Sequence, residues 1–174
     1  AFLKKLKRTA QNNLILKPAE LIINDQEHRI FNKDINKLMS EVEGDILYLD
    51  PPYNHRQYAT NYHLLETIAK YDNPKIHGKT GLREYENQKS LYCSRTQAKE
   101  AFKDLILKAK VRYIFLSYNN EGLMTLDDIM EIMSLRGKYG YFTKEYNRFK
   151  ADKDENREYS ANKTLEYLHY VSCN

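Results

Sequence analysis

Several features common in proteins are scarce or missing from this sequence. It contains no tryptophan and two cysteines among its 174 residues. Cys93 and Cys173 have no partners at metal-ligand spacing and no third or fourth cysteine, which predicts reduced thiols and no metal site, with a single disulfide as the alternative. No apolar run approaches the roughly 20 residues that cross a bilayer, and residues 1–5 show no signal-peptide pattern. The sequence therefore indicates a soluble globular protein without a membrane partner.

The composition is that of an ordinary globular protein. The length is sufficient for one hydrophobic core, and 41% of the residues are hydrophobic while 30% are charged. The net charge of +4 is compatible with a polyanionic partner but does not require one. We expect residues 1–174 to form a single domain.

Apolar periodicity predicts strands that alternate with helices. Short apolar runs predict strands at 21–23, 29–31, 46–49, 111–116, 141–146 and 164–171. Helical spacing predicts helices at 2–14, 34–40, 62–69, 94–109 and 125–133. The last two open with capping-box patterns, Ser94 with Gln97 and Thr125 with Asp128. This order favours an α/β sheet, mostly parallel, with helices on both faces and a C-terminal antiparallel hairpin. A long loop is expected at 72–89.

The most informative segment is Asp50-Pro51-Pro52-Tyr53, which directly follows the apolar run 46–49. Proline fixes φ and lacks a backbone donor, so the chain leaves the sheet at this point. A carboxylate, a free backbone carbonyl and an aromatic ring then face one small space. This set suits a planar ring that bears an amine, because the two oxygens accept its protons and the tyrosine stacks on its face.

Asp-Pro-Pro-Tyr after an apolar strand resembles the catalytic motif of amino-group DNA methyltransferases, especially the N6-adenine enzymes of bacterial restriction–modification systems. The alternative is an ordinary turn at a strand end, where Asp-Pro-Pro also occurs. Residues 50–58, 62–67 and 162–168 are similar to these enzymes in the same order. The resemblance implies a partial Rossmann-like methyltransferase sheet, S-adenosylmethionine as cofactor, double-stranded DNA as partner and a location in the bacterial cytoplasm.

The resemblance also implies roles for the motif residues. The carboxylate of Asp50 and the carbonyl of Pro51 would hold the two amine hydrogens, Pro52 would complete the rigid turn, and Tyr53 would stack on the base. Because a base inside a duplex cannot reach such a pocket, the target adenine must be flipped out.

Cofactor and DNA contacts follow from the same resemblance. Asp34 and Ile35 map onto the family's cofactor-adenine site, with Asp50 next to the cofactor as well; a helix N-cap is the alternative for Asp34. The candidates for DNA contacts are Arg56, Tyr58, Lys79 and Arg83. For each of them, the alternative is an ordinary solvated side chain. The segment 117–120 is a candidate lining of the base pocket.

The departure from the family is the missing cofactor turn. The six glycines include no Gly-x-Gly pair, so the chain resembles only the C-terminal catalytic part, with the glycine-rich turn and target recognition expected upstream or on a second chain. An incomplete DNA-binding fragment or a subunit of a split methyltransferase is therefore an alternative. Methylation of RNA or of a protein amide is another, although those relatives more often carry asparagine in place of Asp50. A phosphate loop at 78–80 is disfavoured because Asn73 replaces its first glycine.

Overall fold

The computed structural model describes residues 12, 13, 15, 17–147 and 163–174, and contacts divide the chain into two units, Ala1–Asn32 and Lys33–Asn174. Residues 17–32 of the first unit contain no helix or strand, and their apolar side chains at 21–23 and 30 are exposed. The predicted strands at 21–23 and 29–31 are therefore wrong, because no described strand pairs with their backbone groups. Most of the helix predicted at 2–14 lies outside the described residues. The expectation of one domain stays a prediction.

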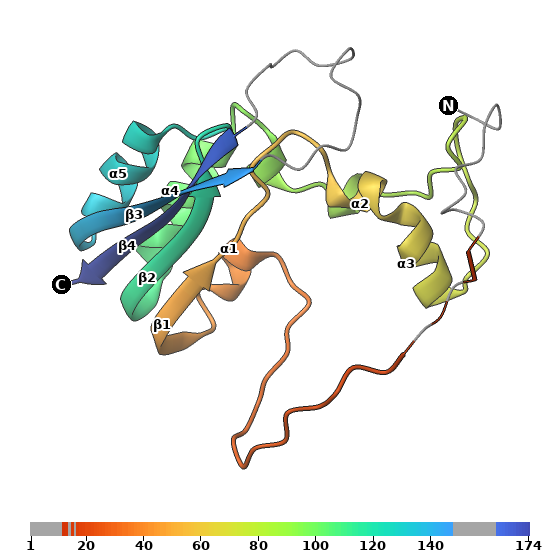
Figure 1. Ribbon diagram of the computed structural model, residues 1–174, viewed down its shortest axis with the longest axis horizontal. Coiled ribbons are helices and arrows are strands. Elements are labelled where there is room, and N and C mark those ends of the chain that lie inside the picture. Colours follow the sequence, from red (N-terminus) through yellow and green to blue (C-terminus); the bar gives the residue numbers. More distant parts are fainter. Residues whose placement is uncertain (1–11, 14, 16, 148–162) are drawn as a thin grey trace. The chain divides into compact units, whose positions relative to one another are not determined.

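The second unit contains the helices and strands (Figure 1). In chain order they are α1 (Ile35–Leu38), β1 (Glu43–Leu49), α2 (Tyr58–Asn61), α3 (His63–Lys70), the 3₁₀ helices η2 (Glu86–Gln88) and η3 (Leu91–Cys93), α4 (Ala98–Lys108), β2 (Lys110–Asn119), α5 (Leu126–Ser134), β3 (Gly137–Asn147) and β4 (Lys163–Cys173). The long loop predicted between α3 and α4 is confirmed, apart from the two 3₁₀ turns.

The four strands form one sheet in the order β1-β2-β4-β3. Strands β1 and β2 are parallel, whereas β4 is antiparallel to both β2 and β3. The predicted α/β class and the C-terminal antiparallel hairpin are confirmed. The sheet is not mostly parallel, however, because the early runs expected to add parallel strands do not pair, which leaves one parallel pair among the described strands.

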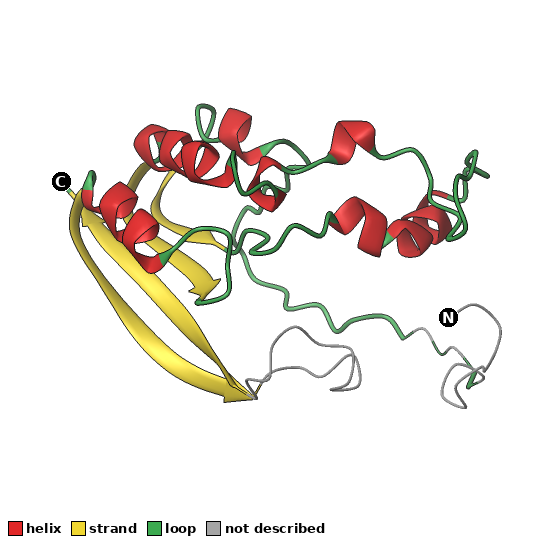
Figure 2. Cartoon of the chain, turned by 90° about the horizontal axis from the view of Figure 1, so that it is seen from above, coloured by secondary structure: helices red, strands yellow, loops and turns green. Residues whose placement is uncertain are grey.

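The hydrophobic core lies between the sheet and helices α4 and α5 on one of its faces (Figure 2). Helix α4 buries Ala98, Ala101, Phe102 and Leu105, the stripe that its helical spacing predicts. These side chains pack with buried residues of α5 and of the strands, namely Ile129, Met133, Ile114, Leu116 and Val171. Helix α1 packs against α4 on the same face.

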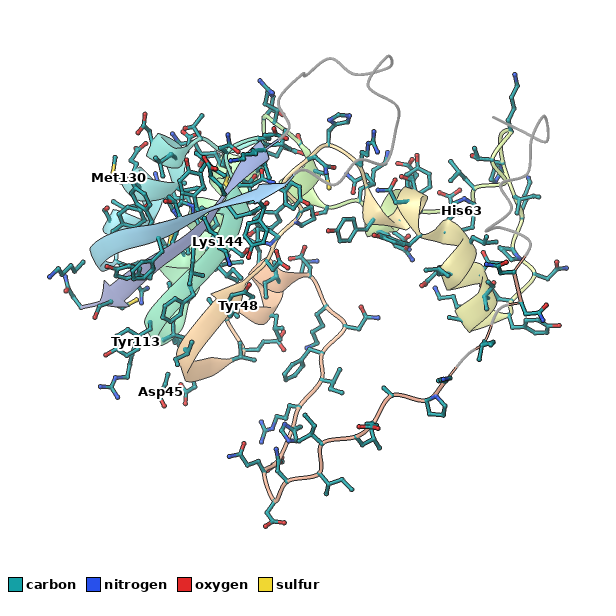
Figure 3. The ribbon with its side chains drawn as sticks, viewed as in Figure 1. Asp45, Tyr48, His63, Tyr113, Met130 and Lys144 are labelled. Atoms are coloured by element: carbon teal, nitrogen blue, oxygen red, sulfur yellow. The ribbon has the colours of Figure 1, made fainter. Side chains whose placement is uncertain are left out.

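The opposite face of the sheet carries exposed apolar side chains. Ile46 and Tyr48 of β1 are 64% and 60% exposed, and Tyr113 of β2, labelled with Tyr48 in Figure 3, is 42% exposed. Phe142 and Leu168 continue this face on β3 and β4. The prediction of helices on both faces is therefore wrong for the part of the chain that the structure describes, in which the packed helices lie on one face.

Local capping signals differ in their outcome. Thr125 and Asp128 form the predicted capping box at the start of α5, with reciprocal hydrogen bonds of 3.1 and 2.9 Å. The box predicted for Ser94 and Gln97 does not form. Helix α4 begins at Ala98, and the backbone carbonyl of Ser94 accepts the amides of Gln97 and Ala98 instead.

Both cysteines are free thiols, as predicted, with Cys93 buried and Cys173 half-buried. Among the described residues, no helix is long and apolar enough to span a membrane.

His169 of β4 is a buried titratable group in the core. Its side chain is 0% exposed, and its Nδ1 atom lies 2.9 Å from the hydroxyl of Tyr139. The rings of Tyr139 and Tyr167 stack on it. Burial lowers the pKa of His169 from 6.5 to about 4 because the charged imidazolium loses its hydration.

The folded protein should therefore lose stability as the pH falls below 6.5. Between about pH 7 and pH 5, His169 becomes protonated in the unfolded chain but stays neutral in the folded protein, because its pKa there is about 4. The free energy of unfolding should therefore fall by about 2 kcal/mol over this range. Urea unfolding of the wild type and of His169→Phe at several pH values measures this effect. The variant should lack the decrease in this window, and equal decreases in both proteins would contradict the account.

Candidate active site at the end of strand β1

Strand β1 ends beside β2, where its last residue, Leu49, pairs with Leu116. The chain then leaves the sheet through Pro51 and Pro52, which are half-buried, while the preceding Asp50 is exposed. The carboxylate of Asp50 makes no hydrogen bond or ion pair with any described residue. The strand end therefore presents an acid that is free to accept hydrogen bonds from a ligand.

Tyr53 follows the prolines and is anchored by its backbone. Its carbonyl accepts a hydrogen bond of 3.0 Å from the amide of Leu123, in the loop after β2. Its ring makes an edge-to-face contact with Tyr118, with centroids 6.4 Å apart and planes at 88°. The side chain remains 39% exposed. The ring is thus fixed at one contact while part of its surface stays open for stacking.

Tyr118 lies beneath this arrangement as a buried support. Its side chain is 1% exposed, and its hydroxyl accepts the amides of Leu123 and Met124 at 3.1 and 3.3 Å. Burial raises the pKa of the Tyr118 phenol, although the two amides act in the opposite direction. The sequence placed 117–120 near the pocket but gave Tyr118 no role of its own. The available signal was the alternation along β2, in which Tyr118 follows Ile114 and Leu116 on the same buried face.

The loop after β2 is also tied to strand β4. The side-chain oxygen of Asn120 accepts hydrogen bonds of 3.0 Å from the hydroxyl of Thr164 and from the amide of Leu165. The amide of Asn120 in turn donates to the carbonyl of Leu165 at 3.0 Å. The described part of the 162–168 segment thus closes the loop that holds Tyr53.

The segment after Tyr53 is held against η3. The side chain of Gln57 exchanges two hydrogen bonds with the backbone of Ser90, at 3.2 and 2.8 Å, and Asn54 accepts the amide of Arg56 at 2.9 Å. The guanidinium of Arg56 is exposed and has no ion pair within the described ranges. This predicted DNA contact therefore has a fixed backbone and a free cationic head.

Tyr58 lies close enough to the strand end to interact with it. Its pKa is raised by burial and then by the neighbouring Tyr53, Tyr62 and Asp50, in that order. Tyr58 also makes an edge-to-face contact with Tyr62, with centroids 5.5 Å apart. The two rings line an open hollow of about 410 Å³ on α2 and α3, together with Leu65 and Ala69. Asp50 and Tyr53 are not among the residues that line this hollow.

Lys79 lies at the tip of a tight turn in the loop after α3. Gly78 and Gly81 adopt φ values of 66° and 67°, and His77 and Leu82 close the turn with backbone hydrogen bonds of 2.7 and 2.9 Å. The lysine is exposed. A phosphate loop leads into a helix, which this closed turn does not, so the sequence-based rejection of that alternative agrees with the fold.

Arg83 differs from the other predicted DNA contacts because it is buried. It is 8% exposed, its guanidinium forms a two-pronged ion pair with Asp72, and it donates to the hydroxyl of Thr67 at 3.3 Å. The hydrogen bond from Arg83 lowers the pKa of the Asp72 carboxyl. In this conformation Arg83 fastens the loop to α3, and its DNA contact stays a prediction.

Asp34 caps helix α1, since its side chain accepts the amide of Lys37 at 3.1 Å. The N-cap alternative is thereby confirmed, while the strand expected before Asp34 is absent from the described chain. Ile35 packs against the core, and Asn36 anchors α1 to α4 through the carbonyl of Ala101 at 2.7 Å. A cofactor role for Asp34 and Ile35 stays a prediction.

The chain resembles a known family over most of its length. Residues 1–132 match the family model described as D12 class N6 adenine-specific DNA methyltransferase. The chain is 53% identical over 171 residues to the Type II methyltransferase M.NlaIII of Neisseria lactamica, which aligns 98% of this chain with 51% of that protein. It is 42% identical over 174 residues to M.FokI of Planomicrobium okeanokoites, covering 98% of this chain and 26% of that protein.

A third relative shows the same pattern of coverage. The Type II methyltransferase M.CviAII of Paramecium bursaria Chlorella virus 1 is 34% identical over 173 residues, which are 98% of this chain and 50% of that protein. The chain thus spans about half of these relatives' length or less. No solved structure matches it at a significant level.

Loss of the Arg83–Asp72 pair should destabilise the fold. Arg83→Met leaves the Asp72 carboxylate without its partner and a buried site without its hydrogen bonds, so the free energy of unfolding should fall by about 1–3 kcal/mol. Lys79→Met, on the exposed turn of the same loop, should change it by less than about 0.5 kcal/mol. Chemical denaturation measures both, and equal stabilities would show that the ion pair does not fasten the loop.

Proposed function

The chain belongs to the D12 class N6 adenine-specific DNA methyltransferases, and on this premise we propose that it forms the catalytic part of an enzyme that methylates the N6 amine of adenine in double-stranded DNA. The proposal rests chiefly on the exposed carboxylate of Asp50, which has no partner in the described part of the chain, beside the half-exposed ring of Tyr53 at the end of β1. The names of the relatives support a role in a restriction–modification system.

The proposed chemistry depends on the amine's lone pair. The exocyclic nitrogen of adenine is a poor nucleophile because its lone pair is delocalised into the ring. Asp50 and the carbonyl of Pro51 accept the two amine hydrogens and favour the geometry in which the lone pair stays on nitrogen as the transition state forms. Asp50 orients the amine and does not deprotonate it before attack, because an amine is too weak an acid.

Access to these groups requires an extruded base. Flipping costs a few kcal/mol of unstacking, part of which is recovered when the base stacks on Tyr53. Arg56 and Lys79 are the exposed cations of the predicted set, and each would reduce the repulsion among DNA phosphates. Tyr58, next to Asp50 and Tyr53, is a candidate neighbour of the flipped nucleotide. DNA and cofactor meet in the bacterial cytoplasm, which completes the proposal.

The residues of this chain fit part of the cofactor. S-adenosylmethionine supplies, when bound, an electrophilic methyl group on a sulfonium. Asp34 is exposed and uses one carboxylate oxygen, Oδ1, for its cap, so Oδ2 can accept a hydrogen bond from the adenosine amine. Ile35 would pack beside that ring, and Asp50 would lie near the charged end.

A second candidate function is a catalytic subunit that depends on another polypeptide segment. The observation that favours it is the lack of any Gly-x-Gly pair in a chain that spans about half of M.NlaIII. The glycine-rich turn would then come from elsewhere, either from the same gene product or from a second chain. Methylation of RNA or of a protein amide receives no such support, since position 50 is aspartate.

Asp50→Ala should abolish methyl transfer while leaving the fold intact. Loss of one acceptor of the amine hydrogens should lower kcat by at least about 100-fold, and an exposed carboxylate without partners contributes little to stability. Transfer of radiolabelled methyl groups to unmethylated DNA by the full-length protein measures the effect. Asp45→Ala is the control, because Asp45 is an exposed acid on the same strand that, among the described residues, pairs with the exposed Arg112 alone. Retained turnover in Asp50→Ala would refute the assigned role.

Residues 1–174 alone should bind the cofactor poorly. Calorimetric titration with S-adenosylmethionine should show no heat for this chain, because the described residues offer no glycine-rich cradle for the methionine end. Heat should appear when the chain is mixed with the part of M.NlaIII that it does not cover, or in the full-length protein. Micromolar binding by the isolated chain would show that its own residues complete the cofactor site.

A further inference from the structure

We propose that Gly122 and Tyr118 are positioning residues that fix Tyr53 in the orientation in which an extruded adenine stacks on it. Neither residue is expected to touch the reacting atoms. Gly122 provides the space for the Tyr118 ring, and Tyr118 holds the loop amide that holds Tyr53. This inference rests on the proposed function and adds to it the residues that set the geometry of the stacking ring.

Gly122 lies close against the ring of Tyr118. A Cβ atom at position 122 would lie 2.1, 2.6 and 2.9 Å from three ring atoms of Tyr118, all shorter than real Cβ contacts. The φ angle of Gly122 is not in the left-handed region, so space rather than backbone freedom demands glycine here. The packed core surrounds Tyr118, which is 1% exposed, so its ring cannot simply turn aside.

Tyr118 is connected to Tyr53 through the backbone amide of Leu123. The amide of Leu123 lies 3.0 Å from the carbonyl of Tyr53 and 3.1 Å from the hydroxyl of Tyr118, so one N–H group serves both tyrosines. The two rings are also in edge-to-face contact. A displacement of the Tyr118 ring therefore disturbs the backbone anchor and the ring contact of Tyr53 together.

A displacement of the Tyr53 ring should slow catalysis without preventing binding. A tilted or shifted Tyr53 ring still lets DNA and cofactor bind, but it holds the flipped base away from Asp50 and Pro51. Misplacement by about 1 Å can cost on the order of 100-fold in rate. A defect of this kind appears in kcat, whereas the dissociation constant of S-adenosylmethionine stays unchanged.

The experiment compares Gly122→Ala with Gly44→Ala in the full-length protein. A Cβ at position 44 meets nothing within 4 Å, so Gly44→Ala is the matched control. Gly122→Ala should lower kcat by about 10- to 100-fold, with cofactor affinity within about twofold of the wild type, and Gly44→Ala should change neither. Normal kcat in a folded Gly122→Ala protein would overturn the proposal.

A double-mutant cycle tests whether Gly122 acts through Tyr53. If it does, Gly122→Ala in a Tyr53→Ala background should cost little beyond Tyr53→Ala alone, whereas independent losses would multiply. Multiplied losses would overturn the proposal. If Gly122→Ala does not fold, Tyr118→Phe takes its place in the cycle; it keeps the ring, removes the hydroxyl and should lower kcat by about 2- to 10-fold.

Fluorine NMR of protein labelled with 3-fluorotyrosine separates this inference from the proposed function. Gly122→Ala should shift the Tyr53 resonance, identified from Tyr53→Phe, and Gly44→Ala should not. A wild type that transfers no methyl group but shows this shift would contradict the proposed function and support the positioning role. An active protein whose Tyr53 resonance is unmoved by Gly122→Ala would contradict the positioning role alone.

Discussion

The parallel pairing of β1 with β2 is the constraint on which the candidate site depends. Because the strands are parallel, their carboxyl ends lie at the same edge of the sheet, where Leu49 ends β1 opposite Leu116 and β2 continues to Asn119. Ligands of open α/β sheets bind at such edges. The prolines after Asp50 then turn the chain out of the sheet, while the loop after β2 reaches back to the Tyr53 carbonyl. Acid, carbonyl and ring therefore take their positions from two neighbouring strand ends.

Within the described residues, the sheet has packed helices on one of its two faces. Helices α4 and α5 cover one face of the sheet, while Ile46, Tyr48 and Tyr113 remain exposed on the other. Parallel strands are ordinarily buried on both faces. This exposure agrees with the missing glycine-rich turn and with a chain that spans about half or less of its relatives' length. All three observations support the proposal that the chain is the catalytic part of a larger methyltransferase.

Sequence predicted the features that depend on local chemistry. Residue type and spacing were sufficient for four features: the strand before Asp50, the rigid turn after it, the buried stripe of α4 and the capping box of Thr125. The failures concern partners distant in the chain. The runs at 21–23 and 29–31 look like strands but pair with no described strand, the ion pair of Arg83 with Asp72 has no signal in the sequence, and Tyr118 supports Tyr53 through a loop amide. No periodicity encodes such long-range contacts.

The central claim is that Asp50 and Pro51 hold the amine of an extruded adenine against Tyr53. Its most direct test is a crystal structure of the full-length protein bound to a duplex that it methylates and to a cofactor analogue. The account predicts an unstacked adenine whose N6 atom lies about 2.7–3.2 Å from the Asp50 carboxylate and the Pro51 carbonyl, with the base parallel to the Tyr53 ring. An adenine that stays paired in the duplex, or an amine bound by other groups, would contradict it.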